Sequence, residues 1–158
     1  MGLASILLDS LWAALFAVAL GVRLTAPHQY LAPTFLSGFA GRLVHSLLVQ
    51  WGIGRDWATV LASAAIVAVA VATTRRHRVS PLVLICGVLP LGSSGAVFRA
   101  VFELLKVSSA EGEALEAADL AWIANASRAF TGTMAIALGL GVGMTIARLF
   151  NRREAEGV

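Results

Sequence analysis

The chain has 158 residues, of which 58% are hydrophobic and only 13% are charged, and its mean hydropathy is +0.82. A soluble domain is about half apolar and about a quarter charged, so this chain lacks the residues that would cover a water-facing surface. Its net charge of +3 does not indicate a nucleic-acid partner, because the basic residues stand between apolar runs and form no continuous face. The composition predicts a single all-α integral membrane domain, residues 1–158, in a lipid bilayer.

Two apolar segments open the chain, and each has about the 20 residues that a membrane-spanning helix needs. Residues 4–24 form the first; they lack the basic start and small-residue cleavage site of a signal peptide, so we expect them to stay in the protein. Asp9 lies near the outer end of this segment and is predicted to be solvated at the interface. Residues 30–51 form the second segment, which is the least hydrophobic and carries Arg42 and His45.

Three further apolar segments follow. Residues 57–74 are the most uniformly apolar, and the basic run 75–78 ends them. Residues 79–105 are interrupted by the sequence Pro-Leu-Gly-Ser-Ser-Gly at 90–95. The last segment, 121–149, comes after an acidic connection. The sequence therefore predicts five transmembrane helices, the fourth of them interrupted near mid-membrane.

The distribution of basic residues predicts the orientation, because loops rich in lysine and arginine stay in the cytoplasm. Alternate ends of the five segments place Arg55 and Lys106 on one side. The other side receives Arg23, Arg75, Arg76, Arg78, Arg148, Arg152 and Arg153. We therefore expect a bacterial inner-membrane protein with its N-terminus outside and its C-terminus in the cytoplasm.

The interruption at 90–95 is the strongest local signal for a binding site. Proline followed by Gly-Ser-Ser-Gly cannot continue an undisturbed helix, and unpaired backbone is tolerated at membrane depth only beside protein or a wet cavity. Transporters use such breaks to bind substrates. Ser93 and Ser94 are suitable N-caps for a half-helix that starts near Gly95, whose N–H groups would meet an anion, while carbonyls released by Pro90 would meet a cation. The alternative is a proline kink filled by neighbouring helices.

Ionisable residues inside a membrane are costly and are candidates for function. Arg99 and Glu103 are four residues apart on one helix face, so they form either an internal salt bridge or substrate contacts. We include both in the predicted substrate site with Pro90, Ser93, Ser94 and Gly95. Arg42 and His45 are three residues apart and are candidates for proton coupling, since histidine titrates near neutral pH; the alternative is a histidine that only makes a hydrogen bond.

Glycines in two segments predict close helix packing. Gly38 and Gly41 lie in the second segment, and Gly139, Gly141 and Gly143 lie in the last one. Small residues let membrane helices approach each other. We expect both sets to contact other helices, in this chain or in a partner.

The residues needed for several other kinds of site are missing from the sequence. A single cysteine, Cys86, excludes a multi-cysteine metal site and is expected to be a small embedded residue. There is no phosphate-binding glycine loop beside a lysine, no zinc-spaced His/Cys cluster and no Ser/His/Asp set. We expect no cofactor, no metal and no enzymatic activity.

Several motifs in their order resemble the threonine/serine exporter family (ThrE-like), and most closely its small-subunit half, the YjjB-like proteins. These are the run Gly-Ile-Gly-Arg-Asp-Trp-Ala-Thr at 52–59, Arg76-x-Arg78-x-x-Pro81, Leu-Pro-Leu at 89–91 and Phe-Arg at 98–99. The resemblance covers nearly the whole chain.

The family pattern continues Pro-Leu-x-Pro-Gly and then Tyr-Arg, and this chain departs from it at three positions. Ser93 and Ser94 replace the second proline and the glycine, and Phe98 replaces the tyrosine. The departures fall within the predicted site and leave the substrate open.

The resemblance implies secondary export of threonine and serine, with a second, larger membrane subunit as the partner. A dicarboxylate such as succinate is an alternative substrate, and a homo-oligomer is an alternative assembly. A non-transporting membrane scaffold is the second hypothesis for function.

Overall fold

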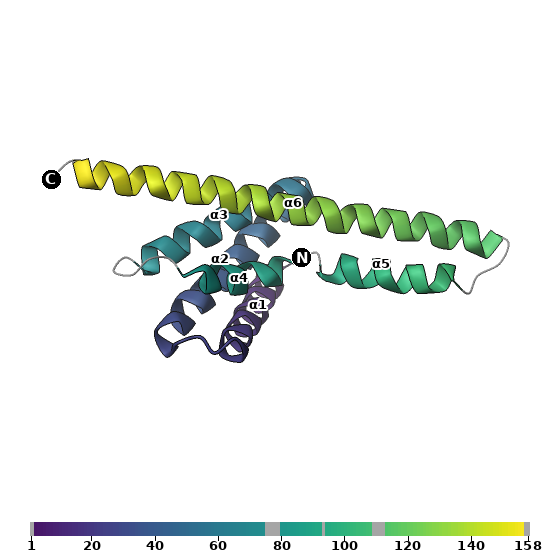
Figure 1. Ribbon diagram of the computed structural model, residues 1–158, viewed down its shortest axis with the longest axis horizontal. Coiled ribbons are helices and arrows are strands. Elements are labelled where there is room, and N and C mark those ends of the chain that lie inside the picture. Colours follow the sequence, from purple (N-terminus) through teal and green to yellow (C-terminus); the bar gives the residue numbers. More distant parts are fainter. Residues whose placement is uncertain (1, 75–79, 93, 109–112, 157–158) are drawn as a thin grey trace. The chain divides into compact units, whose positions relative to one another are not determined.

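The computed structural model describes residues 2–74, 80–92, 94–108 and 113–156 (Figure 1). Within these ranges all regular elements are helical, which confirms the predicted all-α class. In chain order they are α1 (Leu3–Arg23), η1 (His28–Tyr30), α2 (Leu31–Gln50), α3 (Arg55–Thr73), α4 (Pro81–Val88), η2 (Leu89–Leu91), α5 (Ser94–Val107) and α6 (Glu113–Glu156). The chain forms two compact units, one of Met1–Leu91 with Ala135–Val158 and one of Gly92–Met134. The single domain over 1–158 stays a prediction.

The turns after α1 and α2 each begin with a residue in the left-handed region, Thr25 (φ 55°) and Gly52 (φ 83°). After α1, the Ala26 N–H donates to the Gly21 carbonyl at 2.9 Å, and the turn after α2 has the same pattern. These bonds satisfy carbonyls that a helix end leaves unpaired and stop each helix sharply. Short reversals therefore join the first three helices.

Helices α1 and α2 run antiparallel and approach closely through small residues. Gly21 lies beside Thr34, and a Cβ on Gly38 would lie 2.8 Å from the Cβ of Ala17. The buried residues of α1 recur every three or four positions on one face, as the helical period requires. They are Ile6, Ser10, Ala14, Ala17 and Gly21. Four of the five are small, so the two backbones can pack together tightly.

Helix α2 is central to the first unit, since it contacts α1, α3, α4 and η2 (Figure 1). A Cβ on Gly41 would collide with Ile66 of α3 and lie 3.7 Å from Leu91 of η2. Gly87 of α4 lies against Ser37. Because residue 87 meets 37 and residue 91 meets 41, α4 runs parallel to α2.

The second half of α6 packs along α3. A Cβ on Gly139 would collide with Val60 and Ser63, and one on Gly143 would lie 2.9 Å from the Cβ of Val67. Residue numbers rise together along both helices, so these segments run parallel. Gly38, Gly41, Gly139 and Gly143 therefore contact other helices as predicted.

Gly141 is the exception among the predicted packing glycines, because a Cβ there would meet nothing within 4 Å. It lies two positions from Gly139 and from Gly143, so it faces away from α3. Gly141 therefore has no close helix neighbour in the described part of this chain, and its contact with a partner helix stays a prediction.

The second unit contains α5 and residues 113–134 of α6. The apolar side chains of α5 are largely exposed, among them Val97, Phe98, Val101, Phe102 and Leu105. At about 1.5 Å per residue, the 14 residues of α5 extend about 21 Å, which is shorter than the roughly 30 Å of a hydrocarbon core.

Among the described residues, three helices are long and apolar enough to cross a membrane: α1, α3 and the part of α6 at Asp119–Leu149. These correspond to the predicted segments 4–24, 57–74 and 121–149. Helix α2 has 20 residues, but its composition is too polar for it to be one of the three candidate membrane spans. The segment Pro81–Leu91 is apolar but too short. The fourth segment, predicted as 79–105, is divided between α4 with η2 and α5. That these two pieces form one interrupted span stays a prediction, as does the count of five.

Candidate functional site

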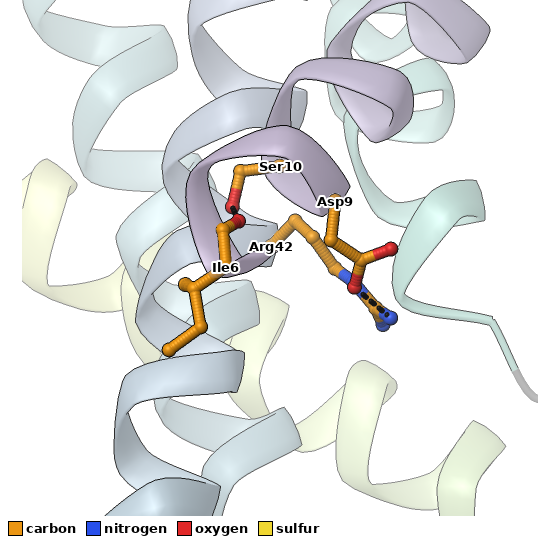
Figure 2. A network of polar contacts seen from close by, with 4 residues as sticks. All are labelled: Ile6, Asp9, Ser10 and Arg42. Atoms are coloured by element: carbon orange, nitrogen blue, oxygen red, sulfur yellow. Dashed lines mark hydrogen bonds and ion pairs between the residues drawn. The ribbon is translucent and has the colours of Figure 1, made fainter. Parts of the chain in front are cut away.

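An ion pair between α1 and α2 is the most prominent polar feature of the first unit (Figure 2). Arg42 donates from Nε at 3.0 Å and from Nη2 at 2.7 Å, and Oδ2 of Asp9 accepts both hydrogen bonds. Both distances are typical of charge-assisted bonds. Asp9 is therefore paired with Arg42 although half of its side chain is exposed, and its place at the membrane interface stays a prediction.

The helix face that carries the pair follows from the neighbours of Asp9. Ser10, the next residue, is fully buried, and its hydroxyl donates to the Ile6 carbonyl at 2.8 Å. Figure 2 shows the Asp9 carboxylate leaving the same turn toward Arg42 and away from Ile6. The pair thus lies at the margin of the packed α1–α2 face, with 51% of the Asp9 side chain and 29% of the Arg42 side chain exposed.

The pair lies well inside the length of both helices. Asp9 is six residues from the start of α1, or about 9 Å, and Arg42 is eight residues from the end of α2, or about 12 Å. Helix α1 is long and apolar enough to span a membrane, so Asp9 lies within a candidate membrane span. A charge there costs about 2.5–3.5 kcal/mol on insertion scales, so such groups are retained where they serve a function.

Buried polar groups of α2 lie along the same helix. His45, 8% exposed, is one turn from Arg42. Ser37 is fully buried, and its Oγ lacks a hydrogen-bond partner among the described residues. A hydroxyl without a partner in such surroundings is unusual.

The predicted break begins beside the same two helices. Residues 89–91 form η2, which contacts α1, α2 and α3. Leu91 lies against Gly41, the residue before Arg42. The start of the break, including the half-buried Pro90, is therefore at the level of the ion pair.

The other predicted site residues that the structure describes, Ser94, Gly95, Arg99 and Glu103, belong to the second unit. Ser93 lies outside the described residues; α5 begins at Ser94, one residue before the predicted start near Gly95, and the side chains at 94–96 are not described. Arg99 is exposed. Glu103 accepts a hydrogen bond from Lys106 Nζ at 3.0 Å, so the ion pair of this helix joins Glu103 to Lys106 and not to Arg99.

The sequence reasoning missed the contact between Asp9 and Arg42. A signal was present, since one acidic residue in the first apolar segment and one basic residue in the second can neutralise each other. The helix register that brings them together is not visible from either segment alone.

Three described helices are long and apolar enough to span a membrane, as expected of an integral membrane protein. Among the described residues no group of His, Cys, Asp or Glu could hold a metal ion. The family model described as "Threonine/Serine exporter, ThrE" matches residues 9–150, and the chain belongs to this family of membrane transport proteins. Neither the curated proteins nor the solved structures contain a match to the chain.

Proposed function

We propose that the chain is a membrane subunit of a secondary exporter that moves threonine and serine out of a bacterial cell. Its family is one of threonine/serine exporters. The observation that carries the proposal is the Asp9–Arg42 pair within two long helices, next to the start of a helix break. A protein that only anchored or scaffolded others would not need either feature.

Five spans and the predicted orientation fit the directions of the helices in the first unit. Helix α2 is antiparallel to α1, α4 is parallel to α2, and the second half of α6 is parallel to α3. Such directions are expected if the chain crosses the membrane five times, and the N-terminus outside is proposed from the distribution of the arginines. They support α2 as a span whose polar residues are covered by neighbouring helices.

A second, larger membrane subunit completes the exporter in this proposal. Five helices make a thin wall around a pathway, and many large apolar side chains of this chain are exposed, such as Trp12, Phe16 and Phe130. Gly141 also offers an open small-residue face. These surfaces suit lipid and a partner helix bundle.

The substrate contacts that we propose are those of the break. The hydroxyls of Ser93 and Ser94, the N–H groups near Gly95 and the Arg99 guanidinium suit a carboxylate. Carbonyls near Pro90, or Glu103, suit an ammonium group. His45 and Arg42 are proposed to couple transport to protons.

Export of labelled threonine, serine and succinate from loaded cells tests the proposal. Cells would express this chain with the larger exporter subunit, this chain alone, the larger subunit alone, or neither. We expect threonine and serine efflux only when both subunits are present. Efflux of succinate alone would mean that the substrate is a dicarboxylate and not an amino acid. Absence of efflux for all three compounds would contradict an exporter and favour the scaffold hypothesis.

A further inference from the structure

We infer that the Asp9–Arg42 pair binds the charged head of the exported amino acid, with the substrate carboxylate on Arg42 and the substrate ammonium on Asp9. This inference rests on the proposed function and specifies its substrate class. It makes Asp9 and Arg42, both in the first unit, a contact for this head group that is separate from the contacts proposed at the break.

Arg42 has donors to spare for a second carboxylate. A guanidinium carries five N–H groups, and the two bonds to Asp9 use Nε and one N–H of Nη2. Both of these bonds end on Oδ2 of Asp9. An incoming carboxylate can therefore accept hydrogen bonds from Arg42 before the bonds between Arg42 and Asp9 break. Asp9 can then accept a hydrogen bond from an ammonium group, so neither charge is left unpaired.

The exposed fractions of the pair indicate which side the substrate would approach. Half of the Asp9 side chain and more than a quarter of the Arg42 side chain are open, although the adjoining Ser10 is fully buried. The inference requires this open side to face a polar pathway, because hydrocarbon would solvate the two charges poorly.

The charges of the pair match a zwitterion. A free amino acid carries a carboxylate and an ammonium on the same carbon atom, so one molecule can satisfy a neighbouring cation and anion together. Succinate carries two carboxylates, and the second would be repelled by Asp9. The pair therefore favours an amino acid over a dicarboxylate.

Ligands that lack one charge test this assignment. The full chain would be purified with its larger subunit, and binding of L-threonine, N-acetyl-L-threonine, L-threonine methyl ester and succinate would be measured by competition with labelled threonine. N-acetylation removes the ammonium and esterification removes the carboxylate. We expect each modified ligand to bind wild-type protein at least about tenfold more weakly than threonine does, since each lost charged hydrogen bond is worth about a factor of ten or more.

The variants Asp9→Asn and Arg42→Gln should change the ligand preference in opposite ways. Asp9→Asn should weaken the binding of threonine at least about tenfold but leave the binding of N-acetyl-threonine, which lacks the ammonium, unchanged. Arg42→Gln should weaken the binding of threonine but leave the binding of the methyl ester, which lacks the carboxylate, unchanged. Asp56→Asn is the matched control, because it removes an exposed carboxylate at the start of α3 and should change nothing. The double variant Asp9→Asn/Arg42→Gln removes both charges, and its melting temperature shows whether loss of binding is loss of folding.

The outcomes separate this inference from the proposed function. The inference would be overturned, and the proposed function kept, if the wild-type complex exports threonine and the variants Asp9→Asn and Arg42→Gln export it with the same half-saturating concentration. Equal weakening of all four ligands by both variants would also overturn it, because that is the effect of a structural ion pair. A wild-type complex that neither exports nor binds threonine would overturn both.

Discussion

Gly139 and Gly141 are two residues apart on α6, but only Gly139 contacts α3. A Cβ on Gly139 would collide with the hydroxyl of Ser63 and with the backbone carbonyl of Val60, and the carbonyl cannot move without shifting α3. A Cβ on Gly141 would meet nothing within 4 Å. The two glycines therefore form a matched pair for testing the packing of α6.

Gly139→Ala should destabilise the protein by about 1–3 kcal/mol, the usual cost of inserting a methyl group into a packed interface. Gly141→Ala should leave stability unchanged or raise it slightly, because alanine favours the helix. The melting temperature and yield in detergent would be compared for both variants. Equal behaviour of the two would mean that this face of α6 does not pack against α3.

The pairing of Asp9 with Arg42 shows at the residue scale what a single sequence could and could not reveal. Both residues were visible as charges in apolar segments, and Arg42 was already a candidate for function. Their contact depends on the register of α1 against α2, which is set by small residues such as Gly38 and Ala17. Those residues predict close packing but not which turns lie opposite each other.

At the scale of elements, α2 shows why hydropathy alone is a poor guide to this bundle. Its buried residues are Pro33, Thr34, Ser37, Gly38, Gly41 and His45, which lower its hydropathy without facing lipid. The helix was predicted from the sequence as 30–51 and is observed at Leu31–Gln50. Its contacts with α1, α3, α4 and η2 could not be predicted, because periodicity gives a buried face but not the neighbours that bury it.

The fourth segment shows the same limit in another form. Pro90 and the glycines and serines after it predicted that the helix stops, and α4 does end at Val88 before η2. The sequence did not predict that Glu103 pairs with Lys106, because positions three and four residues away are equally accessible on a helix. A role of Arg99 in the substrate site stays a proposal.

The break itself can be tested by substitutions that keep the helices intact. Ser93→Ala with Ser94→Ala should weaken threonine export while the protein stays in the membrane, because two hydroxyl groups are lost. Arg99→Ala should impair export more severely, since a full positive charge is lost. Arg99→Lys should keep export only if a positive charge is sufficient without the two parallel hydrogen bonds that arginine can donate. Initial efflux rates at equal protein levels are the measurement. Normal export by both alanine variants would exclude the break as a site and leave it as a packing kink.

At the scale of the whole molecule, the directions of the helices and the arginines give independent arguments for one topology. Gly139 and Gly143 meet Val60 and Val67 in the same order, so α3 and the second half of α6 point the same way. The end of α3 at Thr73 comes just before the basic run 75–78, and α6 carries Arg148 near its own end. Both basic ends should therefore lie on one side of the membrane, which the positive-inside rule identifies as the cytoplasm.

Labelling of single cysteines in intact cells and in inverted vesicles tests this topology. With Cys86→Ala as background, cysteines would be placed at Ala110 and Arg153, and at Arg76 as a same-side control for Arg153. An impermeant maleimide should label position 110 only from outside, and positions 76 and 153 only from the cytoplasmic face, because an odd number of spans lies between 76 and 110 and again between 110 and 153. If 110 and 153 were labelled from the same face, the last helix would not cross the membrane and the five-span topology would fail. If 76 and 153 were labelled from opposite faces, the parallel course of α3 and α6 would be excluded in the membrane, and with it the orientation drawn from the arginines.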